Sequence, residues 1–417
     1  MQWYRRSATA VAVIVASAAV VAACGGSDKS SSSSSSSSAP AAKTPTGKPI
    51  VLYDITDTSG AGSISAVLQQ FPVAEQAAVD YINKTLGGLE GRPFKLVKCD
   101  SKADPAATSA CANQAVKDGA IAKVGLSVLW DNGNKIFSKA GIVSNNAPVT
   151  ASDSSSPTSF PFGGGAASEW PGEVNYWATK MGAKHGVTLA DDNAQGQVNV
   201  DLMQAEAKKH PGFKLDVVRL PIGADPTPSV AKVLGYKPDV VFTAAAGSAA
   251  VSVYRAFQQQ GFSPSKIVNT GATVDQETFF NKVDQPAVEG SYYSYEFETY
   301  DDTSNPDVKT YRDAMKKYSP VDGKSEFYQW GFADVMTIYN IAKKIGGAKF
   351  DQKTYLDFMK NVEGQQVFMG GMLSKKSAPP AAPQIVQPTI RIVQYKGGKV
   401  VPVSDGFFNP LATAGQS

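Results

Sequence analysis

Few side chains in this 417-residue chain could do covalent or metal chemistry. Its two histidines, His185 and His210, stand apart from any nucleophile motif. There is no nucleophile elbow, no phosphate-binding loop and no cluster with the spacing of metal ligands. The carboxylates are scattered, and no pair can be given acid and base roles from its spacing. We therefore predict that the chain is not an enzyme and needs neither a metal nor a cofactor.

The N-terminus has the pattern of an export signal. Arg5 and Arg6 give a positive start, an apolar run follows over residues 8–21, and small residues precede Cys24. This arrangement is typical of a signal peptide rather than of a membrane span. Val21-Ala22-Ala23-Cys24 also resembles the lipobox of bacterial lipoproteins, which implies lipidation of Cys24. The route of export, Sec or twin-arginine, stays open.

The residues after Cys24 predict a disordered tether. Ser30–Ser38 is an uninterrupted serine run, and residues 24–49 contain almost no apolar side chain that could repay the entropy of ordering. Such a tether would hold a folded domain away from a membrane surface. We therefore expect a lipid-anchored protein on the outer surface of the cell membrane or in the periplasm.

Cys99 and Cys111 are the remaining cysteines. An even pair in an exported chain favours a disulfide. A metal site is the alternative, but it would need more ligands close by. We predict the disulfide because the chain is expected to be exported and two cysteines remain to pair.

The folded region alternates short β-rich runs with helical patterns. Expected strands include 50–53, 94–99, 121–126, 142–144, 186–190, 214–220, 240–243 and 266–269. Expected helices include 72–86, 131–140, 248–260 and 328–345, and residues 390–403 have a hairpin pattern. This alternation predicts α/β architecture with parallel sheets. It restarts after Gly163-Gly164-Gly165, which indicates two similar lobes.

Several segments resemble one family, the type I periplasmic solute-binding proteins of the branched-chain amino acid class. They are Asp80-Tyr81-Ile82-Asn83 with Gly87–Arg92, Cys99-Asp100 with Asp104-Pro105-Ala106, and Phe257–Phe262. The resemblance implies two doubly wound, Rossmann-like lobes joined by three crossovers, which close on a ligand like a hinged trap. The expected divisions are a signal peptide (1–23), the tether (24–49), lobe 1 (50–166 and about 297–365), lobe 2 (167–296 and about 366–405) and a tail (406–417).

The resemblance also implies a set of ligand-binding positions. Hydroxyls and neighbouring amides after the third and fourth strands would hold a ligand carboxylate, and the second lobe would add polar groups of its own. A ligand ammonium would need a carboxylate partner, and Asp192, Asp275 and Glu296 all remain candidates. An aromatic side chain could stack on the ligand, although core packing is the more frequent role of such residues. The expected ligand-binding residues are Ser127, Trp130, Thr150, Ala151, Ser152, Asp192, Ser248 and Tyr293.

The function implied by the resemblance is capture of a small polar solute for an ABC-type importer. The solute would be an amino acid or a related amide or acid, and the partner a membrane permease. The alternative is a membrane-tethered sensor of the same fold without a transport role. A net charge of +3 without a basic stripe argues against nucleic-acid binding. We expect a monomer.

Overall fold

A computed structural model describes residues 44–60, 64–126, 132–145, 147–150, 152–379 and 382–412. Residues 41–417 form one compact unit, which is the unit described below. The predicted signal peptide and the lipidation site Cys24 lie outside the described residues.

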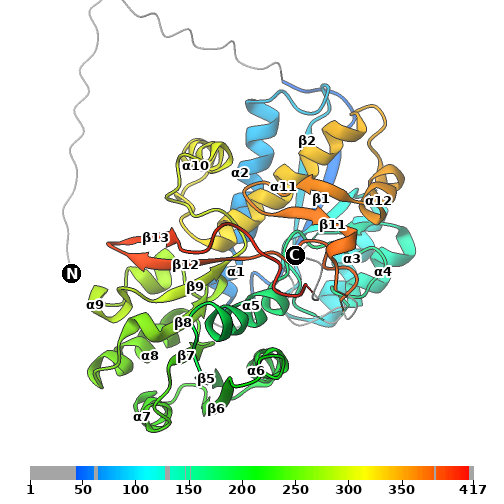
Figure 1. Cartoon of the computed structure of the whole chain (residues 1–417). Coiled ribbons are helices and arrows are strands. Elements are labelled where there is room, and N and C mark those ends of the chain that lie inside the picture. The colour runs from blue at the N-terminus through cyan, green and yellow to red at the C-terminus, as the bar shows by residue number, and fades with distance from the viewer. Residues whose placement is uncertain are drawn as a thin grey trace, which may run out of the picture. The chain divides into compact units, whose positions relative to one another are not determined.

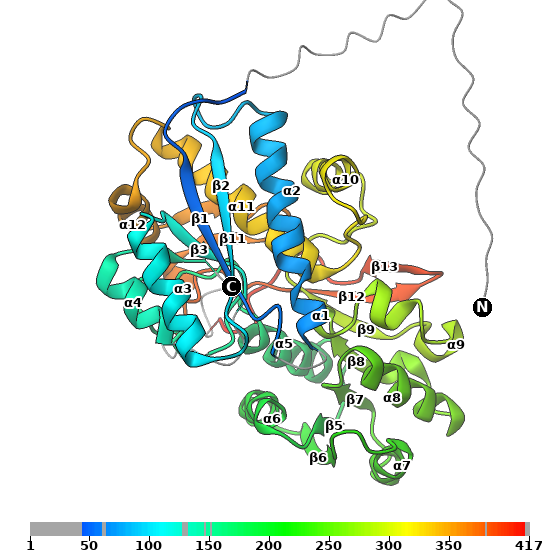
Figure 2. The same cartoon turned by 180° about the vertical axis from the view of Figure 1, so that it is seen from behind.

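Lobe 1 is built on a parallel sheet with strand order β2-β1-β3-β4. Alternate residues of the central strand face opposite ways: Leu52 joins a core cluster with α2 and α11, and Tyr53 joins another with α3 and α4. Helices therefore cover both faces of the sheet (Figures 1 and 2). The strands are β1 (Ile50–Thr56), β2 (Phe94–Asp100), β3 (Ala122–Val124) and β4 (Val143–Ser144). The helices are α1 (Ile64–Leu68), α2 (Gln70–Lys84), α3 (Pro105–Lys117), α4 (Asn132–Ala140), α10 (Pro306–Tyr318), α11 (Glu326–Ile345) and α12 (Gln352–Lys360).

Lobe 2 is built on a seven-stranded sheet with strand order β13-β12-β9-β8-β7-β5-β6. The strands β5 to β9 are parallel, and β12 and β13 extend the sheet as an antiparallel hairpin. The strands are β5 (His185–Asp191), β6 (Lys214–Leu220), β7 (Val240–Thr243), β8 (Ile267–Thr270), β9 (Tyr292–Tyr295), β12 (Arg391–Lys396) and β13 (Lys399–Pro402). The helices are α5 (Ala166–Thr179), α6 (Ala194–Ala207), α7 (Thr227–Gly235), α8 (Gly247–Gln259) and α9 (Gln285–Val288).

The chain passes between the lobes three times. It leaves lobe 1 just before α5 and returns after β9, where Phe297 joins the core of lobe 1. The third crossing differs from the prediction, which placed it near 366. Val367, Leu373 and Val386 still pack in the core of lobe 1, next to the hairpin β10 (Glu363–Gln366) and β11 (Met372–Ser374). The chain therefore crosses only after Val386, because the apolar residues that follow β10 are buried against lobe 1.

The predicted disulfide is confirmed. Cys99 near the end of β2 is bonded to Cys111 in α3, with the two Cα atoms 5.9 Å apart. Asp104 caps the start of α3, where its carboxylate accepts a hydrogen bond from the Ala107 amide at 2.7 Å. The bridge thus fixes a strand of lobe 1 to the helix that follows it. In the part of the chain that the structure describes, no helix is both long enough and apolar enough to span a membrane.

Candidate functional site

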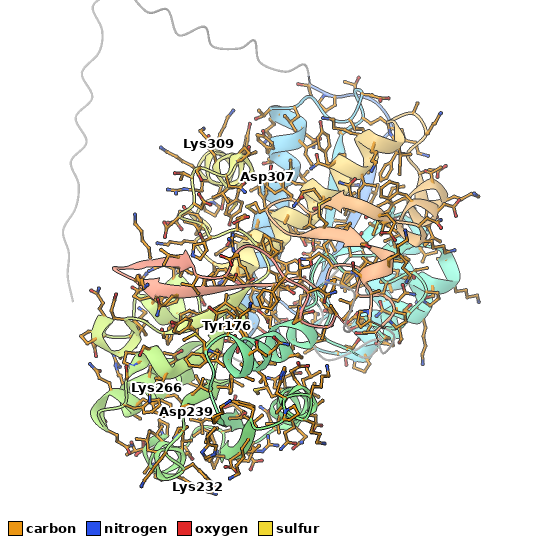
Figure 3. The ribbon with its side chains drawn as sticks, in the orientation of Figure 1. Tyr176, Lys232, Asp239, Lys266, Asp307 and Lys309 are labelled. Atoms are coloured by element: carbon orange, nitrogen blue, oxygen red, sulfur yellow. A yellow bond between two sulfur atoms is a disulfide. The ribbon has the colours of Figure 1, made fainter. Side chains whose placement is uncertain are left out.

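The carboxyl ends of the parallel strands in the two lobes point toward each other. In Figure 2, β1 runs down toward lobe 2. Figure 3 shows Asp239 and Lys266, which directly precede β7 and β8, on the side of lobe 2 away from lobe 1. Ligands of open α/β sheets bind at the carboxyl ends of strands. The loops that follow β3, β4, β5 and β7 are therefore the candidate site.

Thr150 and Ser152, predicted from the loop after β4, are brought together on lobe 1. Their hydroxyl oxygens are 3.3 Å apart. Sequence reasoning missed the two residues that position them. The Asp153 carboxylate accepts from the Thr150 amide at 2.7 Å and from its hydroxyl at 2.9 Å, and the Asn134 amide donates to Ser152 Oγ at 2.7 Å. The only signal for Asp153 was its place directly after the predicted hydroxyls.

Asp192 and Ser248 are exposed on lobe 2, where the loops after β5 and β7 begin the next helices. Asn193, next to Asp192, caps α6 by accepting from the Gly196 amide at 2.7 Å, which leaves the Asp192 carboxylate facing solvent. Ser248 does not cap its helix. The residue in the N-cap position of α8 is Ala246, and Ser248 lies within the first turn.

The carboxylates of the other two acidic candidates accept hydrogen bonds from backbone amides. Asp275 accepts hydrogen bonds from the amides of Glu277 and Thr278 at 2.8 and 2.9 Å, and so caps the short turn Gln276–Phe280. Glu296 is 0% exposed, and its Oε1 accepts from the amides of Gly164 and Gly165 at 2.6 and 2.7 Å. Asp192 is thus the accessible carboxylate of the three.

Tyr293 lies in the core rather than at a binding surface. It is 0% exposed, its ring contacts Phe280 edge-on with centroids 5.6 Å apart, and its hydroxyl is 2.6 Å from Ser291 Oγ. A ligand could reach this ring only by displacing the core of lobe 2. We therefore correct its predicted stacking role. Ser127, Trp130 and Ala151 lie outside the described residues.

A small crevice between the lobes lies beside the crossovers. Asp275 and Tyr295 line it from lobe 2. Ser325, directly before α11, and Gln329, within α11, line it from lobe 1. Residues of both lobes therefore meet beside the point where the chain passes between them. Within the described ranges, no group of three or more histidine, cysteine or acidic side chains could hold a metal ion.

Comparison with known proteins identifies the family. The model of the periplasmic binding protein family matches residues 54–399. The chain therefore belongs to this family, and its two lobes and three crossings have the type I form of the fold. No curated protein matches the sequence.

Solved structures share the fold at low sequence identity. A leucine-binding protein from Thermotoga maritima has a TM-score of 0.65 and 15% identity, covering 87% of this chain and 99% of its own. A solute-binding protein from R. palustris in complex with 4-hydroxybenzoate has a TM-score of 0.67 and 17% identity, covering 88% of this chain and 99% of its own. A fatty acid ABC transporter substrate-binding protein from Thermomonospora curvata has a TM-score of 0.70 and 17% identity, covering 88% of this chain and 94% of its own. The chain thus resembles proteins whose named ligands differ widely in polarity.

Proposed function

We propose that the chain is the substrate-binding lipoprotein of an ABC-type importer. It captures a small polar solute, an amino acid or a related amide or acid, between its lobes and presents the closed form to a membrane permease. Lipidation of Cys24 anchors it to the membrane, outside the cell or in the periplasm. One observation carries the proposal: the carboxyl ends of the parallel strands in the two lobes face each other, and polar residues of both lobes lie there.

Hinge closure is the proposed mechanism. A ligand held by one lobe gains contacts with the other lobe only when the lobes approach, so binding shifts the population toward the closed form. On lobe 1, the hydroxyls of Thr150 and Ser152, with Ser127 and the amide of Ala151, hold a ligand carboxylate. On lobe 2, Asp192 pairs with an ammonium and Ser248 adds a hydroxyl. Trp130 stacks on the ligand.

A thermal-shift screen of the chain from Ala41 onward tests the proposal. The panel contains amino acids, amides, ureas and aromatic acids. A thousandfold excess of ligand over its dissociation constant adds about 4 kcal/mol to the free energy of unfolding and raises the melting temperature. A hit among these classes supports solute capture. If no solute in the panel raises the melting temperature, capture of an amino acid or a related amide or acid is wrong, and a sensor of another solute gains weight.

Asp192→Asn tests the proposed ammonium partner. The variant should weaken binding of an amino acid by about tenfold or more, since a close charge pair at a binding site contributes at least 1.5 kcal/mol. Binding of the same acid without its amino group should be unchanged, as measured by calorimetry. Asp201→Asn, an exposed aspartate further along α6, is the matched control. Equal losses in the two variants would remove Asp192 from the site.

A further inference from the structure

Three buried glutamates meet where the chain passes between the lobes. Glu169 lies in the first turn of α5, Glu296 directly follows β9, and Glu326 is the first residue of α11. Their exposed fractions are 3%, 0% and 1%. One of them thus belongs to lobe 2, one to the returning crossover and one to lobe 1. We call them the hinge glutamates.

Hydrogen bonds of the hinge glutamates join these segments. Glu296 Oε1 accepts from the amides of Gly164 and Gly165, which connects the returning crossover to the first one. Glu326 Oε1 accepts from the Glu296 amide at 2.7 Å, which connects α11 to the same crossover. Any rotation of the lobes that moves these segments apart must therefore break or rearrange bonds to these carboxyls.

Each hinge glutamate also has one oxygen that is buried and has no hydrogen-bond partner among the described residues: Glu169 Oε1, Glu296 Oε2 and Glu326 Oε2. Glycines make the space for two of them. A Cβ on Gly163 would lie 2.4 Å from Glu296 Oε2, and one on Gly271 would lie 2.4 Å from Glu326 Oε2. The close packing favours a neutral carboxyl over an ionised one, because an ionised group here would lack water.

Burial raises the pKa values of the hinge glutamates, and neighbouring carboxyls raise those of Glu169 and Glu326 further. Burial raises the pKa of Glu296 to about 8, although the hydrogen bonds from the Gly165 and Gly164 amides act to lower it. Burial also raises the pKa of Glu169 and of Glu326. Glu326 and Glu296 raise the pKa of Glu169 further, and Glu296 raises the pKa of Glu326 further. Glu173 on α5 raises the pKa of Glu169. Burial raises the pKa of Asp334 on α11 and of Tyr295 on β9; Glu296 raises that of Asp334 further, and Glu326 that of Tyr295. The nearby Arg391 of β12 is paired with Glu298. The amino ends of α5 and α11 oppose these effects only in part, since a helix end contributes less than burial.

We propose that the hinge glutamates form a proton-controlled latch between the lobes. In their protonated form they hold the crossovers and α11 in the arrangement described here. When they lose protons, the like charges of this buried cluster repel, and the carboxylates gain hydration only if the segments separate. The lobes then become free to rotate, so the orientation of the lobes depends on pH even without ligand.

Small-angle X-ray scattering of the ligand-free chain from Ala41 onward tests the latch. Between about pH 6 and about pH 9.5, a range that spans the titration of a carboxyl with so raised a pKa, the radius of gyration should rise. The double variant Glu296→Gln, Glu326→Gln mimics the protonated form and should show no rise. An unchanged radius in the native protein, or an equal rise in the double variant, would overturn the proposal.

Glu173→Gln is the matched control. Glu173 is equally buried, and its Oε1 accepts from the amide and hydroxyl of Ser294 at 3.1 and 2.7 Å. Both residues belong to lobe 2, so this variant should still show the rise in the radius of gyration with pH. If the double variant does not fold, infrared spectroscopy of the native protein decides the question. Protonated carboxyl bands that persist at neutral pH and vanish together with the change in radius support the latch, and their absence at neutral pH refutes it.

Discussion

Lys123 is the cation of a buried cluster in lobe 1. It is 5% exposed, its Nζ donates to the Gly125 carbonyl at 3.4 Å, and four buried acids act on it electrostatically: Asp153, Asp54, Glu75 and Asp334. Burial lowers the pKa of Lys123, while these acids act to raise it. None of the carboxyl oxygens of Glu75 and Asp334 has a hydrogen-bond partner among the described residues. The positive charge of Lys123 therefore compensates for the missing hydrogen bonds of Glu75 and Asp334.

We expect Lys123→Met to lower the free energy of unfolding by about 3–5 kcal/mol at neutral pH, the usual cost of removing one partner from a buried charge pair. Denaturant unfolding measures it. Lys95→Met, an exposed lysine on β2, should change the stability little. A loss no larger than that of the control would show that the carboxyls do not need the cation.

Asp54 gives the same cluster a pH dependence. Burial raises its pKa from 3.8 to about 6, against an opposing hydrogen bond from Thr56. The folded state therefore binds more protons than the unfolded state between these values, and the free energy of unfolding should fall as pH rises through that window. Asp54→Asn should flatten this part of the stability curve, measured by denaturant unfolding at several pH values. If the free energy of unfolding of the variant falls with pH as steeply as that of the native protein, Asp54 is not the group responsible.

The unit of β2 and α3 depends on a covalent tie. The disulfide between Cys99 and Cys111 closes a loop with a sequence separation of 12. A loop of this size stabilises the folded state by about 3 kcal/mol, chiefly by restricting the unfolded chain. Cys99→Ala with Cys111→Ala should lower the free energy of unfolding by about that amount. A reducing agent should destabilise the native protein but leave the double variant unchanged, and equal sensitivity of both would argue against the bridge.

The relative motion of the lobes is the property on which the proposed function depends. At a pH below the titration of the hinge glutamates, a saturating ligand should decrease the radius of gyration, because it adds contacts between lobes only when they close. Scattering with and without the ligand found in the thermal-shift screen measures this change. An unchanged radius on saturation would mean that binding does not close the hinge.

Much of the fold could be predicted because its signals are local. Hydrophobic spacing predicted a helix over 72–86, and α2 spans Gln70–Lys84. The cap at Asp104 and the hairpin of β12 and β13 also follow from neighbouring residues. The candidate site was predicted less well. The sequence named Thr150 and Ser152, but not Asp153 and Asn134, which hold them, because those contacts depend on how the loop after β4 folds back on α4.

The sequence alone determined the alternation of strands and helices, the pairing of the cysteines and the family resemblance, since each depends on residue types at short spacing. Only the tertiary structure decided which polar and aromatic side chains are buried. Tyr293 faces the core, and Glu296 reaches amides more than 130 positions away in the chain. Burial and partners of this kind arise from packing between distant segments. A one-dimensional pattern contains no record of which segments will meet.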